Sequence, residues 1–178
     1  MKKLILIAAF VLILISGGLV FAGWQDSKII KDQLAAEKIK FGTAEELKAG
    51  GRADLVKYAN QTVDTGAEAK AFASYIQGHL EKVAGGKTYS EVSAEFQKDK
   101  TNKTLEAQRQ TLFMGEMLRG TLLNVWGWSM LGTVAIYSAV GLLVVALALL
   151  AVYVALGSNV KPVKVATKKP AKKAARKR

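Results

Sequence analysis

Residues 129–156 read SMLGTVAIYSAVGLLVVALALLAVYVAL, an apolar stretch without a charged side chain. As an α-helix this stretch would be about 42 Å long, which exceeds the ~30 Å hydrocarbon core of a bilayer. The excess length indicates a helix that tilts or extends into the headgroup region. The stretch therefore predicts a C-terminal transmembrane helix, which we place at residues 125–157.

A second apolar stretch, residues 4–25, begins directly after Lys2 and Lys3. A basic start, an apolar centre and a small residue such as Ala22 at the end are also typical of a secretory signal peptide, and cleavage there would leave one span. The apolar run is nevertheless long enough to cross a bilayer, and membrane helices tolerate glycine. We predict a retained signal-anchor helix at residues 1–24, with a cleaved signal peptide as the alternative.

Charge is segregated along the chain, because all 14 acidic residues lie between Asp26 and Glu116 whereas both ends are basic. Basic residues beside a span are retained on the cytoplasmic side of the membrane. We therefore predict a cell-membrane protein with both termini in the cytoplasm and residues 25–124 outside. The tryptophans fit this topology, since they lie where both spans would meet the outer face: Trp24, Trp126 and Trp128.

Short polar patterns predict several helices within residues 25–124. Three Thr-x-x-Glu sequences have the form of a capping box, in which a hydroxyl and a carboxylate bind the free amides at a helix start. They begin at Thr43, Thr65 and Thr88. The pairs Gly50-Gly51 and Gly85-Gly86 are expected to end helices.

The last helix of the outer segment is expected to enter the membrane without a break. No proline and no doubled glycine occurs between Thr104 and Trp126 to end it. The predicted fold class is all-α, with two transmembrane helices flanking an extracytoplasmic helical bundle. A basic, low-complexity tail at residues 158–178 follows the second span.

The tail is expected to be disordered in the cytoplasm, because its lysine-rich composition cannot bury a core. Its charges suit contact with anionic lipid, or with nucleic acid without sequence preference. Lipid is the simpler interpretation, since no aromatic residue lies among the lysines to stack on bases. The expected contact residues are Lys168, Lys169, Lys172, Lys173, Arg176, Lys177 and Arg178.

Small residues at helical spacing in the second span form a surface that another helix can approach closely. They include Gly132, Ala135 and Ala139. Three interpretations remain open: contact with the first span, where Gly18 and Ala22 are four residues apart, contact with another protein, or the ordinary composition of a membrane helix. No charged residue interrupts the apolar part of either span, which disfavours a transporter or channel.

The segment just before the second span combines apolar and charged side chains. Met114 and Met117 would form an adaptable apolar surface, beside Arg119. One interpretation is a docking surface for another membrane protein. The other is a helix that packs on its own domain, with Arg119 extended towards lipid headgroups.

Four segments of the outer region have a characteristic sequence: VDTGAEAKAFA at 63–73, GHL at 78–80, AGGKTYSEVS at 84–93 and QRQTLFMGEMLRGTLLN at 108–124. They resemble a family of bacterial two-span membrane proteins of unassigned function, whose members often carry the label aromatic ring-opening dioxygenase. The resemblance implies two spans around an outer domain and does not extend to the basic tail.

The residues do not support that enzymatic label. Extradiol ring opening uses an iron site of two histidines and one carboxylate, and this chain has a single histidine, His79. No second histidine or cysteine stands at metal-ligand spacing, and no serine lies in a nucleophile elbow. We therefore predict a non-enzymatic protein without cofactor or metal, in which His79 is a partly exposed helix residue.

Two classes of function remain. The first is a structural or accessory subunit that binds another membrane protein, or further copies of itself, through its outer domain and helix faces. The second is an extracytoplasmic sensor that acts through a partner, because the short tail has no room for an output domain. A membrane tether for nucleic acid, acting through the tail, is a further alternative.

Overall fold

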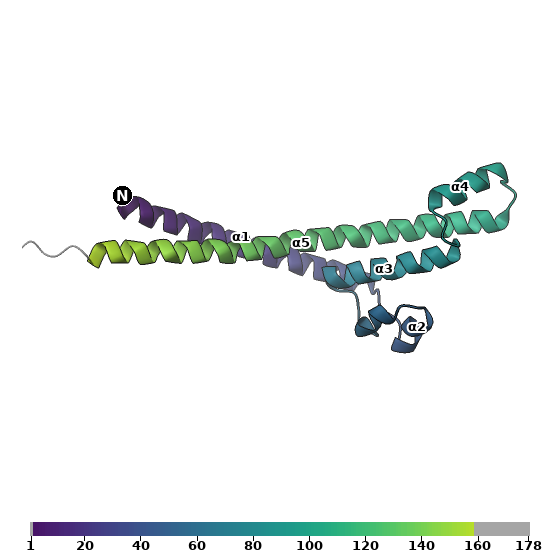
Figure 1. Ribbon diagram of the computed structural model, residues 1–178, viewed down its shortest axis with the longest axis horizontal. Helices are drawn as coiled ribbons and strands as arrows, with labels where there is room; N and C mark the ends of the chain where they lie inside the picture. Colours follow the sequence, from purple (N-terminus) through teal and green to yellow (C-terminus); the bar gives the residue numbers. More distant parts are fainter. Residues whose placement is uncertain (1, 159–178) are drawn as a thin grey trace, which may run out of the picture.

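The computed structural model describes residues 2–158, and this part of the chain is helical without a β-strand (Figure 1), as the all-α prediction requires. Five α-helices and one short 3₁₀ helix follow one another along the chain. They are α1 (Lys2–Glu37), α2 (Ala44–Ala49), η1 (Ala53–Tyr58), α3 (Gly66–Val83), α4 (Tyr89–Lys98) and α5 (Lys103–Ser158).

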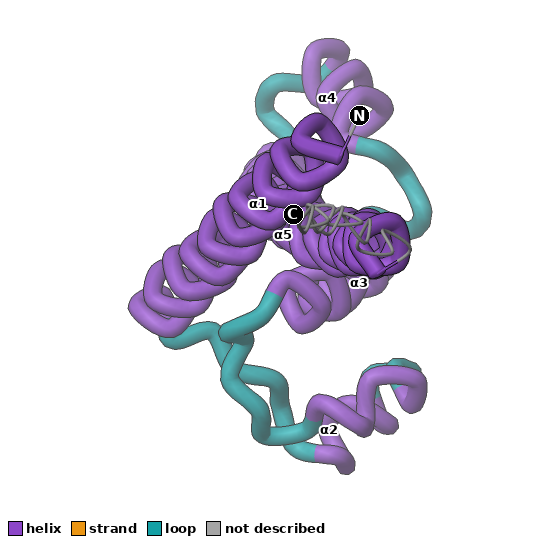
Figure 2. Tube along the Cα trace, turned by 90° about the vertical axis from the view of Figure 1, so that its left-hand side faces the viewer, coloured by secondary structure: helices purple, strands orange, loops and turns teal. Residues whose placement is uncertain are grey.

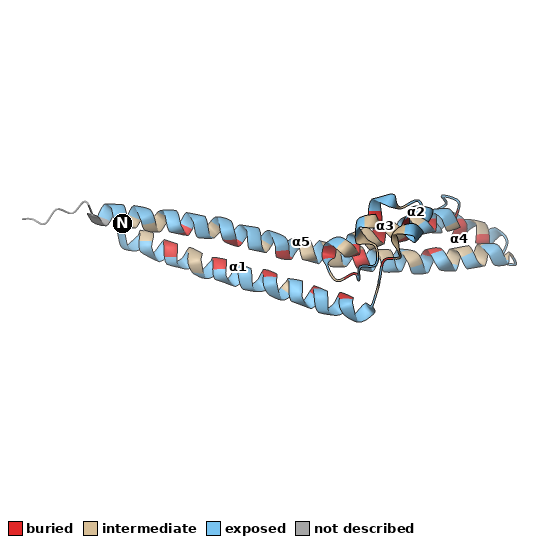
Figure 3. Cartoon of the chain, turned by 90° about the horizontal axis from the view of Figure 1, so that it is seen from below, coloured by how far each residue is buried: buried red, intermediate tan, exposed pale blue. Residues whose placement is uncertain are grey.

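α1 and α5 lie side by side and antiparallel (Figures 1 and 3). At one end, the Lys2 ammonium donates a 2.6 Å hydrogen bond to the carbonyl of Leu156. Towards the other end, Leu34 of α1 and Leu122 of α5 are buried and line the same small pocket. Both helices are long and apolar enough to cross a membrane, so the chain contains the two helices of membrane-spanning length that its sequence predicts.

The contact between α1 and α5 repeats every seven residues, which is the period of a left-handed coiled coil. The buried positions are Ala9, Ser16, Gly23 and Ile30 on α1, and Gly132, Ala139 and Ala146 on α5. Small side chains on both helices let the two backbones approach closely. A Cβ at Gly23 would lie only 2.7 Å from Cγ1 of Ile136 and 2.8 Å from the carbonyl oxygen of Gly132.

The first span meets α5 through other residues than Gly18 and Ala22. Nothing lies within 4 Å of a Cβ placed on Gly18, and Ala22 is exposed. The seven-residue series that contains Ala9 and Gly23 faces α5 instead. A four-residue spacing of small residues occurs on several sides of this span, so spacing alone does not tell which side is turned towards α5.

We call α2, η1, α3 and α4 the outer helices, and they lie at the end of the molecule away from the start of α1 (Figures 1 and 2). α5 runs unbroken from Lys103 to Ser158, which confirms that the last outer helix continues into the apolar stretch. α3 and α4 both pack against the outer half of α5, and η1 contacts both α2 and α3. The outer helices therefore form no bundle separate from α5, because α5 itself supplies the surface on which they pack.

The three predicted capping boxes are all present. The hydroxyls of Thr43, Thr65 and Thr88 each accept a hydrogen bond from the backbone N–H three residues later, and a glutamate carboxylate accepts one from each threonine N–H in return. The glycine pairs end helices as predicted. Gly51, Gly85 and Gly86 have positive φ angles of 75°, 60° and 83°, a conformation that glycine adopts without the steric cost of a Cβ.

The segment between α1 and α3 folds back onto α3 as a small lobe. Phe41 stacks on Tyr58 with ring centroids 5.2 Å apart and meets the edge of Phe72 at 5.1 Å. The Arg52 guanidinium donates to the Asp54 carboxylate at 2.8 and 3.0 Å and to the carbonyl and hydroxyl of Ser74 on α3. The hydrogen bonds from Arg52 hold the pKa of Asp54 below its usual range.

Candidate interaction surface

α3 approaches α5 closely at one glycine. A Cβ on Gly115 would lie 2.5 Å from Cδ2 of Leu80, so the absence of a side chain at this position of α5 makes room for Leu80 of α3. Further along, the Gln108 amide donates a 3.0 Å hydrogen bond to the carbonyl of Val83 at the end of α3. These contacts set α3 firmly against the outer half of α5.

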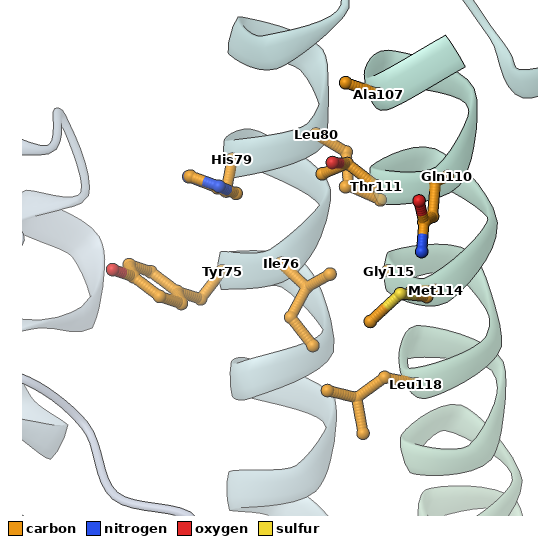
Figure 4. Close-up of a pocket in the computed structure, with 10 residues that line it drawn as sticks. All are labelled: Tyr75, Ile76, His79, Leu80, Ala107, Gln110, Thr111, Met114, Gly115 and Leu118. Carbon is orange, nitrogen blue, oxygen red and sulfur yellow. The ribbon is translucent and has the colours of Figure 1, made fainter.

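An apolar groove remains between these two helices, and we call it the α3–α5 groove. Its volume is about 540 Å³, and its lining residues are Tyr75, Ile76, His79, Leu80, Ala107, Gln110, Thr111, Met114, Gly115 and Leu118. Figure 4 shows Ile76, Leu118 and Met114 between the two helices. Only hydroxyl, amide and imidazole groups interrupt its apolar lining, and it contains no carboxylate or ammonium group.

His79 lies at the margin of this groove. In Figure 4 its imidazole and the ring of Tyr75 point away from α5. The residue is exposed, as predicted, and within residues 2–158 its side chain makes no hydrogen bond or ion pair. In the same part of the chain, no group of three or more histidine, aspartate or glutamate side chains is placed to hold a metal ion.

An exposed face of α5 beside the groove carries large apolar side chains. Phe113 is 54% exposed, Met114 61% and Met117 60%. These residues lie well beyond the tryptophans, since at 1.5 Å per residue Met117 is about 16 Å along the helix from Trp128 and Met114 about 21 Å.

Two arginines of the same stretch contact α3 and α4. The Arg119 guanidinium pairs with Glu116 at 2.9 Å and donates to the side-chain oxygen of Gln77 on α3 at 3.3 Å. Arg109 lies 4.2 Å from the ring centroid of Phe96 on α4. Leu112 and Leu122 of the same stretch are buried against the domain, so α5 carries apolar side chains on its buried face and also, at Met114 and Met117, on its exposed face.

The predicted site residues therefore separate into three groups. Met114 and Met117 are exposed, whereas Arg119 is tied to α3. Gly132 and Ala139 are buried against α1, with Ala135 half-buried, so the small-residue surface is used within the chain. The seven tail residues from Lys168 to Arg178 lie outside the described residues.

Sequence reasoning missed two features of these surfaces. The α3–α5 groove depends on the position of Gly115 opposite Leu80, which no local pattern indicates. Asp26 places one carboxylate oxygen in a buried position without a hydrogen-bond partner, against Gly132 of α5. The sequence shows that Asp26 directly follows the apolar stretch, but it does not show which helix the Asp26 side chain faces.

The chain matches no protein-family model, no curated protein and no solved structure in our comparisons. Inference about its function therefore depends on the surfaces described above.

Proposed function

We propose that the protein is a non-enzymatic integral membrane protein that acts as an accessory subunit and binds another membrane protein through the α3–α5 groove. The observation that carries the proposal is the exposed apolar surface of α5 beside the groove. Met114 is exposed in solution while Arg119, five residues later, is tied to the domain. Large apolar patches on a water-facing surface mark sites of interaction.

The chemistry of the groove suits an apolar partner. Four of its ten lining residues are leucine, isoleucine or methionine, and methionine adapts readily to the shape of another surface. The groove contains no charge to pair with a charged partner. Its distance from Trp128 supports a position outside the hydrocarbon core, so the proposed partner has an apolar segment that emerges from the membrane.

The proposed location is the cell membrane, with both termini cytoplasmic and the outer helices outside. The segregation of charge in the sequence supports this orientation, because basic residues flank the apolar parts of α1 and α5. Packing of Ala9 and Ser16 against α5 supports a retained first span. We assign the basic tail to contact with anionic lipid.

A sensor that binds a small molecule is the second candidate. The volume of the groove, about 540 Å³, favours it, because small-molecule sites commonly measure about 300 to 1,000 Å³. A ligand there would contact α3 and α5 together, and α5 connects the groove directly with the membrane.

Purification of the tagged protein in a mild detergent tests the accessory-subunit proposal. We expect wild-type protein to retain a stoichiometric membrane-protein partner, and Met114→Lys to reduce its recovery at least tenfold, since a charge is costly in an apolar contact. Gln97→Lys on the exposed face of α4 is the matched control. A wild-type preparation without a partner, or full recovery with Met114→Lys, would contradict the proposal.

A further inference from the structure

α5 carries a second seven-residue pattern, distinct from the one that meets α1. Starting at Phe113 and taking alternate steps of four and three residues, every position up to Val152 is uncharged and exposed. We call this series the open seam. It extends over about 40 residues, more than five heptads, whereas three to four heptads already characterise a coiled coil.

The open seam lies on the side of α5 away from α1. Gly127 of the seam and Gly132 of the α1 contact are five positions apart, which is about 140° around a helix. Nothing lies within 4 Å of a Cβ placed at Gly120, Gly127 or Gly141, all of which belong to the seam. α5 thus has one coiled-coil face filled by α1 and another that is unfilled.

The outer end of the seam shows that lipid alone does not account for its composition. Met117 is 60% exposed and lies about 16 Å beyond Trp128 along the helix, and Phe113, further out, is 54% exposed beside the ring of Tyr89 on α4. In contact with water, an unfilled helix face is normally polar. Glu116 lies beside the seam, where it pairs with Arg119 of the same helix and lines a small pocket together with Met117 and Asn124.

We propose that the open seam binds a second copy of this chain, in a parallel dimer whose two-fold axis runs along the membrane normal. Two copies inserted in the same orientation necessarily present their α5 helices in parallel, and a two-fold axis then places each residue opposite its own counterpart. Because the seam contains no charged residue, this arrangement brings no like charges together.

The residues of the seam are self-complementary in two further respects. Asn124 makes no side-chain hydrogen bond within residues 2–158, and an amide both donates and accepts, so it can pair with Asn124 of the second copy. A single asparagine in a coiled-coil seam also specifies register and the number of helices. The seam glycines leave hollows that side chains such as Met117 can fill.

The dimer is independent of the proposed function. Met114 and Leu118 line the α3–α5 groove. Around the helix they lie to one side of Met117 and the seam glycines lie to the other side, so the groove stays open in the dimer. Loss of the dimer and loss of a groove partner are therefore separate outcomes.

Cysteine cross-linking in native membranes tests the arrangement, because the chain has no cysteine of its own. We expect Met117→Cys and Asn124→Cys to give disulfide-linked dimers at least ten times more efficiently than Leu118→Cys. The control residue lies at the same depth, is 43% exposed and faces the groove. Equal yields at positions 117 and 118, or no dimer at 117 and 124, would overturn the proposal.

A charge-exchange experiment tests whether position 117 meets itself. We expect Met117→Glu and Met117→Lys each to be monomeric in mild detergent and to form a mixed dimer when co-expressed, since the opposite charges can pair. Unchanged helical circular dichroism shows that each variant folds. A dimer of either variant alone, or no mixed dimer, contradicts the arrangement. Co-purification of the groove partner with Met117→Lys keeps this result separate from the proposed function.

Discussion

Glycines of α1 differ sharply in what surrounds them, although they lie within six residues of one another. Gly17 and Gly18 face open space, whereas Gly23 lies against the carbonyl of Gly132 and the side chain of Ile136. All three glycines are equally unfavourable in the interior of a helix. Only at Gly23 does the absence of a side chain make room for a neighbouring helix.

Replacement of Gly23 by leucine should weaken the α1–α5 contact. The new Cβ would lie under 3 Å from atoms of α5, and overpacking of this kind costs about 1 to 3 kcal/mol. We expect a lower thermal unfolding midpoint in detergent than for wild type. Gly18→Leu is the matched control and should leave the midpoint unchanged or raised. Equal effects of the two variants would show that α1 does not pack on α5 through this face.

At the scale of elements, the outer helices begin in the same way but differ in their support. α2, α3 and α4 each begin with a capping box. The ten residues of α4 pack on α5 through Val92 and Phe96, whereas α3 is nearly twice as long and has five buried positions. An isolated helix as short as α4 is marginal in water, so its cap contributes a larger share of its stability.

The first turn of α4 should therefore be sensitive to acid. Glu91 accepts hydrogen bonds of 2.8 Å from both the N–H and the hydroxyl of Thr88, and these bonds hold its pKa below the usual range. A carboxylate with a lowered pKa stabilises the fold above the unfolded pKa, and this contribution is lost as pH falls through the folded pKa. The relevant window begins below the ordinary glutamate value of about 4.3.

Amide exchange of α4 in wild type and Glu91→Gln measures this effect. At neutral pH we expect weaker protection of the first turn of α4 in the variant, and we expect the difference to shrink as the pH falls below about 4.3. The amides of α3 serve as an internal control. A difference that persists undiminished down to pH 3 would show that the ionised carboxylate is not what stabilises this helix start.

At the scale of the whole molecule, the two apolar helices extend from one end and the outer helices occupy the other (Figures 1 and 3). The start of α1 and the end of α5 lie at the same end, as the bond between Lys2 and Leu156 requires. The mixed-charge helices therefore lie at one end and Lys2 and Lys3 at the other, which accords with the proposed membrane orientation.

Single cysteines in intact cells should report this orientation. We expect Gln97→Cys on α4 to react with a membrane-impermeant thiol reagent, and Thr167→Cys beyond the second span to react only after the membrane is permeabilised. The cysteine-free wild type is the background control. The opposite pattern of labelling would place the outer helices in the cytoplasm and contradict the topology.

Local chemistry alone determined much of this protein. The capping boxes at Thr43, Thr65 and Thr88, the helix ends at the glycine pairs and the unbroken course of α5 all follow from interactions between residues close in sequence. The two helices of membrane-spanning length follow equally from composition. Each of these features depends only on neighbours that the sequence already specifies.

Only the tertiary structure decided which faces meet. That Gly23 rather than Gly18 lies against α5, that Leu80 enters the space at Gly115, and that Arg52 reaches Ser74 all depend on how far one helix is rotated and shifted along another. Rotation and register are determined by how well the side chains of both helices fit together over their whole length. Local composition cannot specify them, because several faces of each helix are apolar enough to pack.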